Sequence, residues 1–136
     1  MLSLPSGWTP VATGSPTAAF LAYSPQRSAY AAIGDGFPPL KHFDALARYA
    51  LDSQTQFYGS HYPNATFRHR KRDLAIGPTE EVIVFVRPKS GSAQEIDSYW
   101  FEVRGKTYNL SCGFPTSLVG TYASVCQAAA RSLRPR

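Results

Sequence analysis

The segment 81–87 constrains the fold of this chain more than any other stretch, because its interior is an unbroken apolar run (Val82, Ile83, Val84, Phe85, Val86). Such a run of β-branched and aromatic side chains is typical of a strand that is covered on both faces. The sequence therefore predicts a central, buried strand. With 136 residues, the chain suits one compact core, since domains of this size bury about 68–70% of their unfolded surface. We expect a single domain over residues 1–136.

Further strand signals lie on both sides of this segment. The predicted strands cover residues 8–11, 18–23, 28–33, 66–76, 81–87, 96–104 and 107–112. Clusters rich in Gly, Pro and Ser separate them, as expected for tight turns in an antiparallel sheet. We expect turns at Gly77 and Pro78 and at Gly105 and Lys106, so that the second half of the sheet is a series of hairpins.

Two segments have the 3.6-residue period of an amphipathic helix. Residues 41–57 place their apolar side chains on one stripe and their charged side chains on the other, with Pro39 near the start. Residues 118–133 form a second stripe, for which Thr116 or Ser117 is expected to act as the N-cap. The order of strands, helix, strands, helix predicts an α+β domain with a mostly antiparallel sheet flanked by two main helices.

The charge balance is basic, with 14 Lys and Arg residues against 9 Asp and Glu residues and a net charge of +5. This balance leaves nucleic acids, anionic surfaces and acidic proteins as classes of partner. No stretch approaches the roughly 18 apolar residues of a membrane span. Residues 1–8 lack the basic and apolar regions of a secretory signal, so we expect no signal peptide there. A leader removed upstream is the open alternative.

The two cysteines are expected to face the same layer of the fold. Cys112 ends the last predicted strand on the face that also carries Tyr108 and Leu110, and Cys126 lies on the apolar stripe of the second helix. If this helix folds back on the strand, the sulfurs meet. A disulfide here would stabilise the fold by roughly 3 kcal/mol. Two buried free thiols are the alternative, and we favour the disulfide slightly.

No cluster in the sequence has the spacing of a metal or cofactor site. The three histidines, His42, His61 and His69, are scattered, whereas a zinc site needs four ligands. Residues 105–107 (Gly-Lys-Thr) look like the end of a phosphate-binding loop, but position 100 is Trp where that motif needs Gly. We therefore expect neither a metal ion nor a cofactor.

No arrangement of nucleophile and base supports an enzyme either. There is no G-x-S-x-G motif, and the carboxylate pairs Glu80/Glu81 and Glu95/Asp97 border predicted loops. We interpret these carboxylates as solvated surface groups rather than as a general acid and base. The chain is accordingly expected to be non-enzymatic.

The basic run 68–72 (Arg-His-Arg-Lys-Arg) is the strongest local signal. On a strand its residues alternate, so that Arg68, Arg70 and Arg72 lie on one face and His69 and Lys71 on the other. Charge on both faces is typical of an edge strand protected against pairing with another sheet. Protein-partner contact is the second interpretation. Nucleic-acid binding is the third, because no recognised nucleic-acid-binding motif accompanies the run.

Aromatic residues make up 13% of the chain, more than a small core needs. Tyr and Trp often carry binding energy at interfaces. We therefore add Tyr99 and Phe101 to Arg68, Arg70 and Arg72 as candidate partner-binding residues, although core packing remains the leading interpretation for any single aromatic residue.

Four stretches carry a family resemblance. They are residues 4–8 (Leu-Pro-Ser-Gly-Trp), the helix with Leu46, Tyr49 and Ala50, the aromatic hairpin 99–112, and the closing segment 128–134 with Leu133 where Phe is usual. Together they resemble the PsbP/DcrB-like α/β/α sandwich superfamily of small bacterial and plastid domains. The resemblance implies that fold but no shared catalytic residues. Its members are lipoproteins, photosystem subunits, adaptors, and chaperones or immunity proteins associated with type VI secretion.

These observations favour a bacterial protein-binding domain with an acidic or amphipathic partner surface. The first hypothesis is a periplasmic or envelope immunity protein that neutralises a cognate toxin by direct binding, which a disulfide would favour. A cytoplasmic effector chaperone of a type VI secretion system, favoured by free thiols, is one alternative. A nucleic-acid-binding module that uses residues 68–72 is the other.

Overall fold

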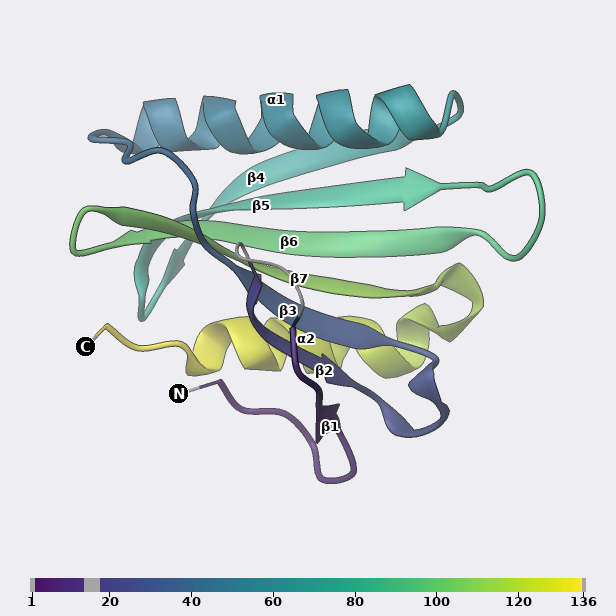
Figure 1. Cartoon of the computed structure of the whole chain (residues 1–136). Coiled ribbons are helices and arrows are strands. Elements are labelled where there is room, and N and C mark those ends of the chain that lie inside the picture. The colour runs from purple at the N-terminus through teal and green to yellow at the C-terminus, as the bar shows by residue number, and fades with distance from the viewer. Residues whose placement is uncertain (1, 14–17, 136) are drawn as a thin grey trace.

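The computed structural model describes residues 2–13 and 18–135, and these residues form one seven-stranded sheet with two main helices (Figure 1). The strands are β1 (Thr9–Pro10), β2 (Ala18–Tyr23), β3 (Tyr30–Gly34), β4 (Thr66–Leu74), β5 (Gly77–Val86), β6 (Gln94–Val103) and β7 (Lys106–Pro115). The helices are α1 (Phe43–His61), α2 (Val119–Ser132) and the short 3₁₀ turns η1 (Pro25–Arg27) and η2 (Thr116–Leu118). The predicted α+β class is confirmed.

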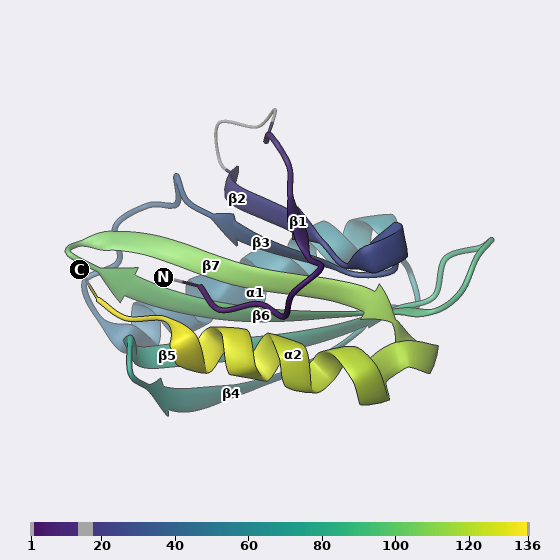
Figure 2. The same cartoon turned by 90° about the horizontal axis from the view of Figure 1, so that it is seen from below.

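The strand order across the sheet is β1-β2-β3-β7-β6-β5-β4, and every neighbouring pair is antiparallel. The two helices lie on opposite faces, as the view from below shows (Figure 2). Helix α1 packs mainly on β5 and also contacts β6 and β4, whereas α2 packs on β7 and β6. The result is a three-layer sandwich in which α2 leaves the β4 side of its face largely uncovered.

The core beneath α1 is built from alternate residues of β5 and β6. Val82, Val84 and Val86 are buried and face Leu46 and Ala50 of the helix. Their neighbours Ile83 and Phe85 are only half-buried, because α2 does not extend over this part of the other face. Segment 81–87 is thus an internal strand as predicted, but it is fully covered on one face only.

The core beneath α2 contains the disulfide. Cys112 on β7 is bonded to Cys126 on α2, which confirms the favoured pairing. Both residues lie in one cluster with Leu110, Ala129 and Leu133. The disulfide therefore attaches α2 covalently to the strand on which it packs.

Two predicted turns are each displaced by one or two residues. The β4–β5 turn is formed by Ala75 and Ile76, and Gly77 and Pro78 already belong to β5. The β6–β7 turn is formed by Arg104 and Gly105, with φ of 53° and 79°. Positive φ at both central residues is the geometry that matches the twist of a two-residue hairpin.

The predicted N-cap of the last helix is wrong. Thr116 and Ser117 form the turn η2, and the residue before α2 is Leu118, without a side-chain cap. Thr116 instead donates its hydroxyl to the carbonyl of Ala93. In the described part of the chain, no helix is long and apolar enough to span a membrane.

Candidate functional site

The basic run lies on β4, which forms an edge of the sheet as predicted. Its register with β5 places Arg68 opposite Ile83 and Arg70 opposite Glu81, on the face that carries α2. His69 and Lys71 point to the α1 face. All of these basic side chains except that of Arg72 are exposed. We call residues 68–72 the basic edge.

A buried carboxylate anchors two arginines of the basic edge. Glu81 is 1% exposed, and its Oε1 accepts hydrogen bonds from Arg70 Nε at 2.6 Å and from Arg72 Nη1 at 3.3 Å. The hydrogen bond to Glu81 and its negative charge raise the pKa of Arg70. Arg70 remains 60% exposed, so its terminal nitrogens face solvent while its Nε holds Glu81. Such a guanidinium can bridge an internal carboxylate and an external one.

The other three basic residues have different contacts. His69 Nδ1 lies 2.8 Å from Glu80 Oε2 on the α1 face, and Lys71 Nζ lies 4.9 Å from the centre of the Phe43 ring. Arg68 packs over the Phe85 ring at 5.2 Å. Among the described residues, no carboxylate forms a salt bridge with Arg68. Its charge is therefore available to a partner.

The carboxylate pairs are buried, so the expectation that they are solvated is wrong. Glu95 is 6% exposed and Asp97 2% exposed, and both share the α2 face with Glu81. Burial raises the pKa of Asp97 to about 8, with further contributions from a hydrogen bond to Glu95 and from the charges of Glu95 and Glu81, while Arg68 opposes the shift. At neutral pH Asp97 therefore holds a proton.

The register of the β4–β5 hairpin is the signal that would have revealed the contact of Glu81 with the arginines. The sequence prediction placed the turn at Gly77 and Pro78, which leaves Glu80 and Glu81 near a loop. The observed turn at Ala75 and Ile76 instead puts Glu81 directly opposite Arg70, well inside the sheet.

Tyr99 and Phe101 lie on the same face as the three arginines but beneath α2. They are 1% and 4% exposed, and both belong to the core cluster that contains the disulfide. Burial, followed by the charge of Glu81, raises the pKa of Tyr99. Of the five candidate partner-binding residues, the structure thus presents Arg68 and Arg70 at the surface, leaves Arg72 half-buried, and places the two aromatic residues in the core.

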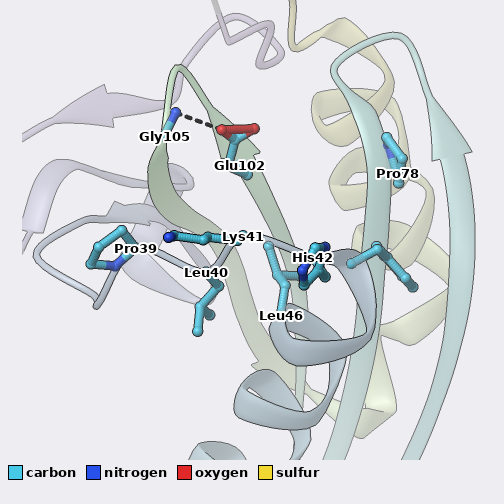
Figure 3. A pocket seen from close by; sticks show the side chains of 9 residues that line it. Pro39, Leu40, Lys41, His42, Leu46, Pro78, Glu102 and Gly105 are labelled. Atoms are coloured by element: carbon cyan, nitrogen blue, oxygen red, sulfur yellow. Dashed lines mark hydrogen bonds between the residues drawn. The ribbon is translucent and has the colours of Figure 1, made fainter.

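A cavity of about 440 Å³ lies at the start of α1 (Figure 3). It is on the α1 face of the sheet, opposite the face that carries Arg68. Its lining is mostly apolar, and it also includes Lys41, His42 and Glu102. Glu102 Oε1 accepts the N–H of Gly105, so this carboxylate holds the β6–β7 turn. Phe43, which contacts Lys71, also lines the cavity. The cavity therefore adjoins the α1 side of the basic edge.

The strand order and the helices on both faces define an α/β/α sandwich with a PsbP-like fold. The solution structure of cyanobacterial PsbP (CyanoP) from Synechocystis sp. PCC 6803 is similar, with a TM-score of 0.74 and 13% identity over 96% of this chain and 83% of that chain. The crystal structure of PA94, a protein of unknown function from Pseudomonas aeruginosa, has a TM-score of 0.63 and 12% identity, covering 100% of this chain and 85% of that one.

No family model and no curated protein matches the sequence. At 12–13% identity, the likeness to solved structures establishes the fold and nothing beyond it. The resemblance drawn from the sequence motifs is confirmed at this level.

Proposed function

We propose that this chain is a non-enzymatic protein-binding domain that holds an acidic surface of a partner protein on its basic edge. One observation carries the proposal: Arg68 and Arg70 lie side by side on an exposed edge strand, the first without a salt bridge in the described structure and the second with solvent-facing terminal nitrogens. Arginines that are already positioned lose little freedom when they bind a carboxylate.

Charge placement favours an acidic protein over nucleic acid. Glu80 and Glu81 contact three of the five residues of the basic edge, which reduces the positive field that a polyphosphate would meet. The alternation of side chains also divides the remaining charge between two faces of the sheet. A nucleic-acid backbone gains most of its affinity from many cations on one continuous surface, whereas a pair of arginines suffices for a local acidic patch.

Within this function, we propose neutralisation of a cognate toxin in the bacterial envelope as the particular role. The disulfide supports this proposal, because such bonds persist in oxidising compartments such as the periplasm and are rare in the cytosol. The alternative role, a cytoplasmic effector chaperone in type VI secretion, was favoured by free thiols, which the structure does not have among its described residues.

The experiment measures binding of poly-glutamate and of duplex DNA across a salt series, using the wild type and the double variant Arg68→Ala/Arg70→Ala. In this variant Arg72 still neutralises Glu81, so the fold should survive. We expect roughly tenfold weaker binding of poly-glutamate, equal to about 1.4 kcal/mol.

The matched control is Arg131→Ala/Arg134→Ala, which removes two exposed arginines at and just after the end of α2 and should change the affinity much less. Equal losses in the two variants would show that only net charge matters and would overturn the proposal. Tighter binding of DNA, with a salt slope that falls in the double variant alone, would favour the nucleic-acid alternative.

A further inference from the structure

The basic edge belongs to a long and regular edge strand. β4 has nine residues and pairs with β5 without a bulge from Thr66 opposite Phe85 to Leu74 opposite Gly77. At the other edge of the described sheet, β1 has only two residues. Proteins usually shorten or bulge an exposed edge so that no further strand can pair with it. β4 has neither feature.

The hairpin geometry shows which backbone groups of β4 are free. In the two-residue β6–β7 hairpin, Val103 and Lys106 flank the turn and form a hydrogen-bonded pair. In an antiparallel sheet the N–H and C=O of one residue point to the same side and alternate along the strand. On β6, the backbone groups of Val103 point to β7, so those of Trp100, three residues away, point to β5 and pair by hydrogen bonds with Glu80. On β5, the backbone groups of Glu80 therefore point to β6, and those of the next residue, Glu81, pair by hydrogen bonds with Arg70 of β4.

The backbone groups of Arg68, Arg70 and Arg72 are therefore directed toward β5. Those of the residues between them are directed away from the sheet, at the open edge. These outward residues are Phe67, His69, Lys71 and Asp73. A row of four unpaired N–H and C=O groups is the template for an added strand.

The side chains determine which strand can use this template. A second copy of β4 would bring arginine opposite arginine, and like charges directly across a pair are destabilising. An acidic strand would meet complementary charge on both faces, from Arg68 and Arg70 on one and from Lys71 on the other. β5 already illustrates this pairing on the inner side, where Glu81 lies opposite Arg70 and Glu80 opposite Lys71.

We propose that the partner binds by adding an extended acidic segment to the open edge of β4 as a further strand of the sheet. This proposal rests on the proposed function and specifies its mode of recognition. Backbone hydrogen bonds from the outward residues hold the segment, and carboxylates spaced two residues apart reach the terminal nitrogens of Arg68 and Arg70. The positive charges of β4 thus disfavour pairing with a second copy of β4 and favour pairing with an acidic segment.

The test uses a nine-residue peptide, matching the length of β4, in which glutamate alternates with threonine and valine. Amide hydrogen exchange of the wild-type protein is measured by NMR with and without saturating peptide. Strand addition should slow exchange at the outward residues by roughly tenfold or more. The amides of Arg68, Arg70 and Arg72 are already bonded to β5, so their exchange should change little.

A matched pair of variants gives a second readout. His69→Pro and His69→Ala both remove the contact with Glu80, but only proline removes the outward N–H, and edge positions with an outward N–H tolerate proline. We expect peptide affinity roughly two- to tenfold lower in His69→Pro than in His69→Ala. Circular dichroism checks that both variants fold, and the exchange experiment on the wild type does not depend on them.

The outcomes separate the two proposals. If the peptide binds, and binding weakens in Arg68→Ala/Arg70→Ala, but exchange shows no alternation along β4, then strand addition is wrong and the acidic-partner function stands. If peptide binding does not depend on these arginines, the proposed function itself fails.

Discussion

At the scale of single residues, the most consequential feature is the group of buried carboxylates on the α2 face. Glu81 is neutralised by two arginines, whereas Asp97 next to Glu95 is neutralised by a proton. Two chemically similar groups on neighbouring strands thus avoid the cost of an unpaired buried charge in different ways. The arginine-paired Glu81 and the protonated Asp97 therefore predict different effects of mutation on stability.

The first prediction concerns pH. Because the pKa of Asp97 is raised from 3.8 to about 8, the folded protein holds a proton that the unfolded chain releases. The resulting stabilisation is complete below about pH 4 and is lost as the pH rises through about 8. We expect the free energy of unfolding to fall across this window by at most about 1.4 kcal/mol per pH unit.

Asp97→Asn should flatten this decline, as measured by urea denaturation at a series of pH values. The control is Asp73→Asn, an exposed carboxylate on β4, which should leave the slope unchanged. A wild-type stability that rises between pH 5 and pH 8 relative to that of Asp97→Asn would contradict the assignment.

The second prediction concerns Glu81. Removing both of its partners in Arg70→Ala/Arg72→Ala leaves a buried charge unpaired, and we expect a loss of about 3 kcal/mol in the free energy of unfolding. Adding Glu81→Leu should recover most of this loss, because the charge is then absent. Arg68→Ala, which breaks no salt bridge in the described structure, should change stability by less than about 0.5 kcal/mol. Chemical denaturation of the four proteins provides the comparison.

The third prediction contrasts two glycines. A Cβ at Gly113 on β7 would lie within contact of the Tyr30 ring, closer than side chains tolerate, whereas a Cβ at Gly59 in α1 would meet no atom within 4 Å. Gly113→Ala should therefore destabilise the protein by about 1–3 kcal/mol. Gly59→Ala should stabilise it by up to about 1 kcal/mol, because alanine is the better helix former. Thermal unfolding of both variants measures the two effects. An equal change in stability in Gly113→Ala and Gly59→Ala would contradict the close packing of Tyr30 against Gly113.

At the scale of elements, the disulfide between β7 and α2 carries the fourth prediction. Cys112→Ala/Cys126→Ala should lower the free energy of unfolding by roughly 3 kcal/mol through the greater freedom of the unfolded chain. Thiol counting on the denatured, unreduced wild type should find no reactive thiol. Two reactive thiols would contradict the bond and would weaken the proposed envelope location.

Hydrophobic period and turn residues were sufficient to predict every strand and both main helices from the sequence. The period identified α1 because Leu46 and Ala50 face β5, and alternation identified the edge character of β4. Turn positions were less accurate, because Gly and Pro mark the neighbourhood of a turn but not its central pair. Arg104 shows this limit, since an arginine with positive φ has no distinctive sequence signal.

The site was predictable only in part, for the same reason. Periodicity assigned Arg68, Arg70 and Arg72 to one face correctly. The burial of Glu81 depends on which residue lies opposite it, and the burial of Tyr99 and Phe101 depends on where α2 packs. Register and helix docking are set by contacts between segments distant in sequence, which no local pattern specifies.

At the scale of the whole molecule, the excess of positive charge is spread over the surface rather than concentrated in one patch. The residues 68–72 lie at one edge of the sheet, and their internal partners Glu80 and Glu81 offset part of their charge. The net charge of +5 is therefore a poor guide to the strength of any single binding surface. It describes a weak positive field around the whole molecule, which salt would screen.

The pairing of β3 with β7 divides the sheet into two parts, β1 to β3 and β4 to β7. The strands β4 to β7 follow one another through short hairpins, whereas β1, β2 and β3 join this sheet through the pairing of β3 with β7. Contacts close in sequence form quickly, and distant ones wait for the chain to close a long loop. Residues 66–115 should therefore assemble as an early folding unit, which also contains the basic edge. The hairpin of β2 and β3 would then dock last, with the Tyr30 ring packing over Gly113. Partial unfolding would release this hairpin while leaving β4 paired with β5.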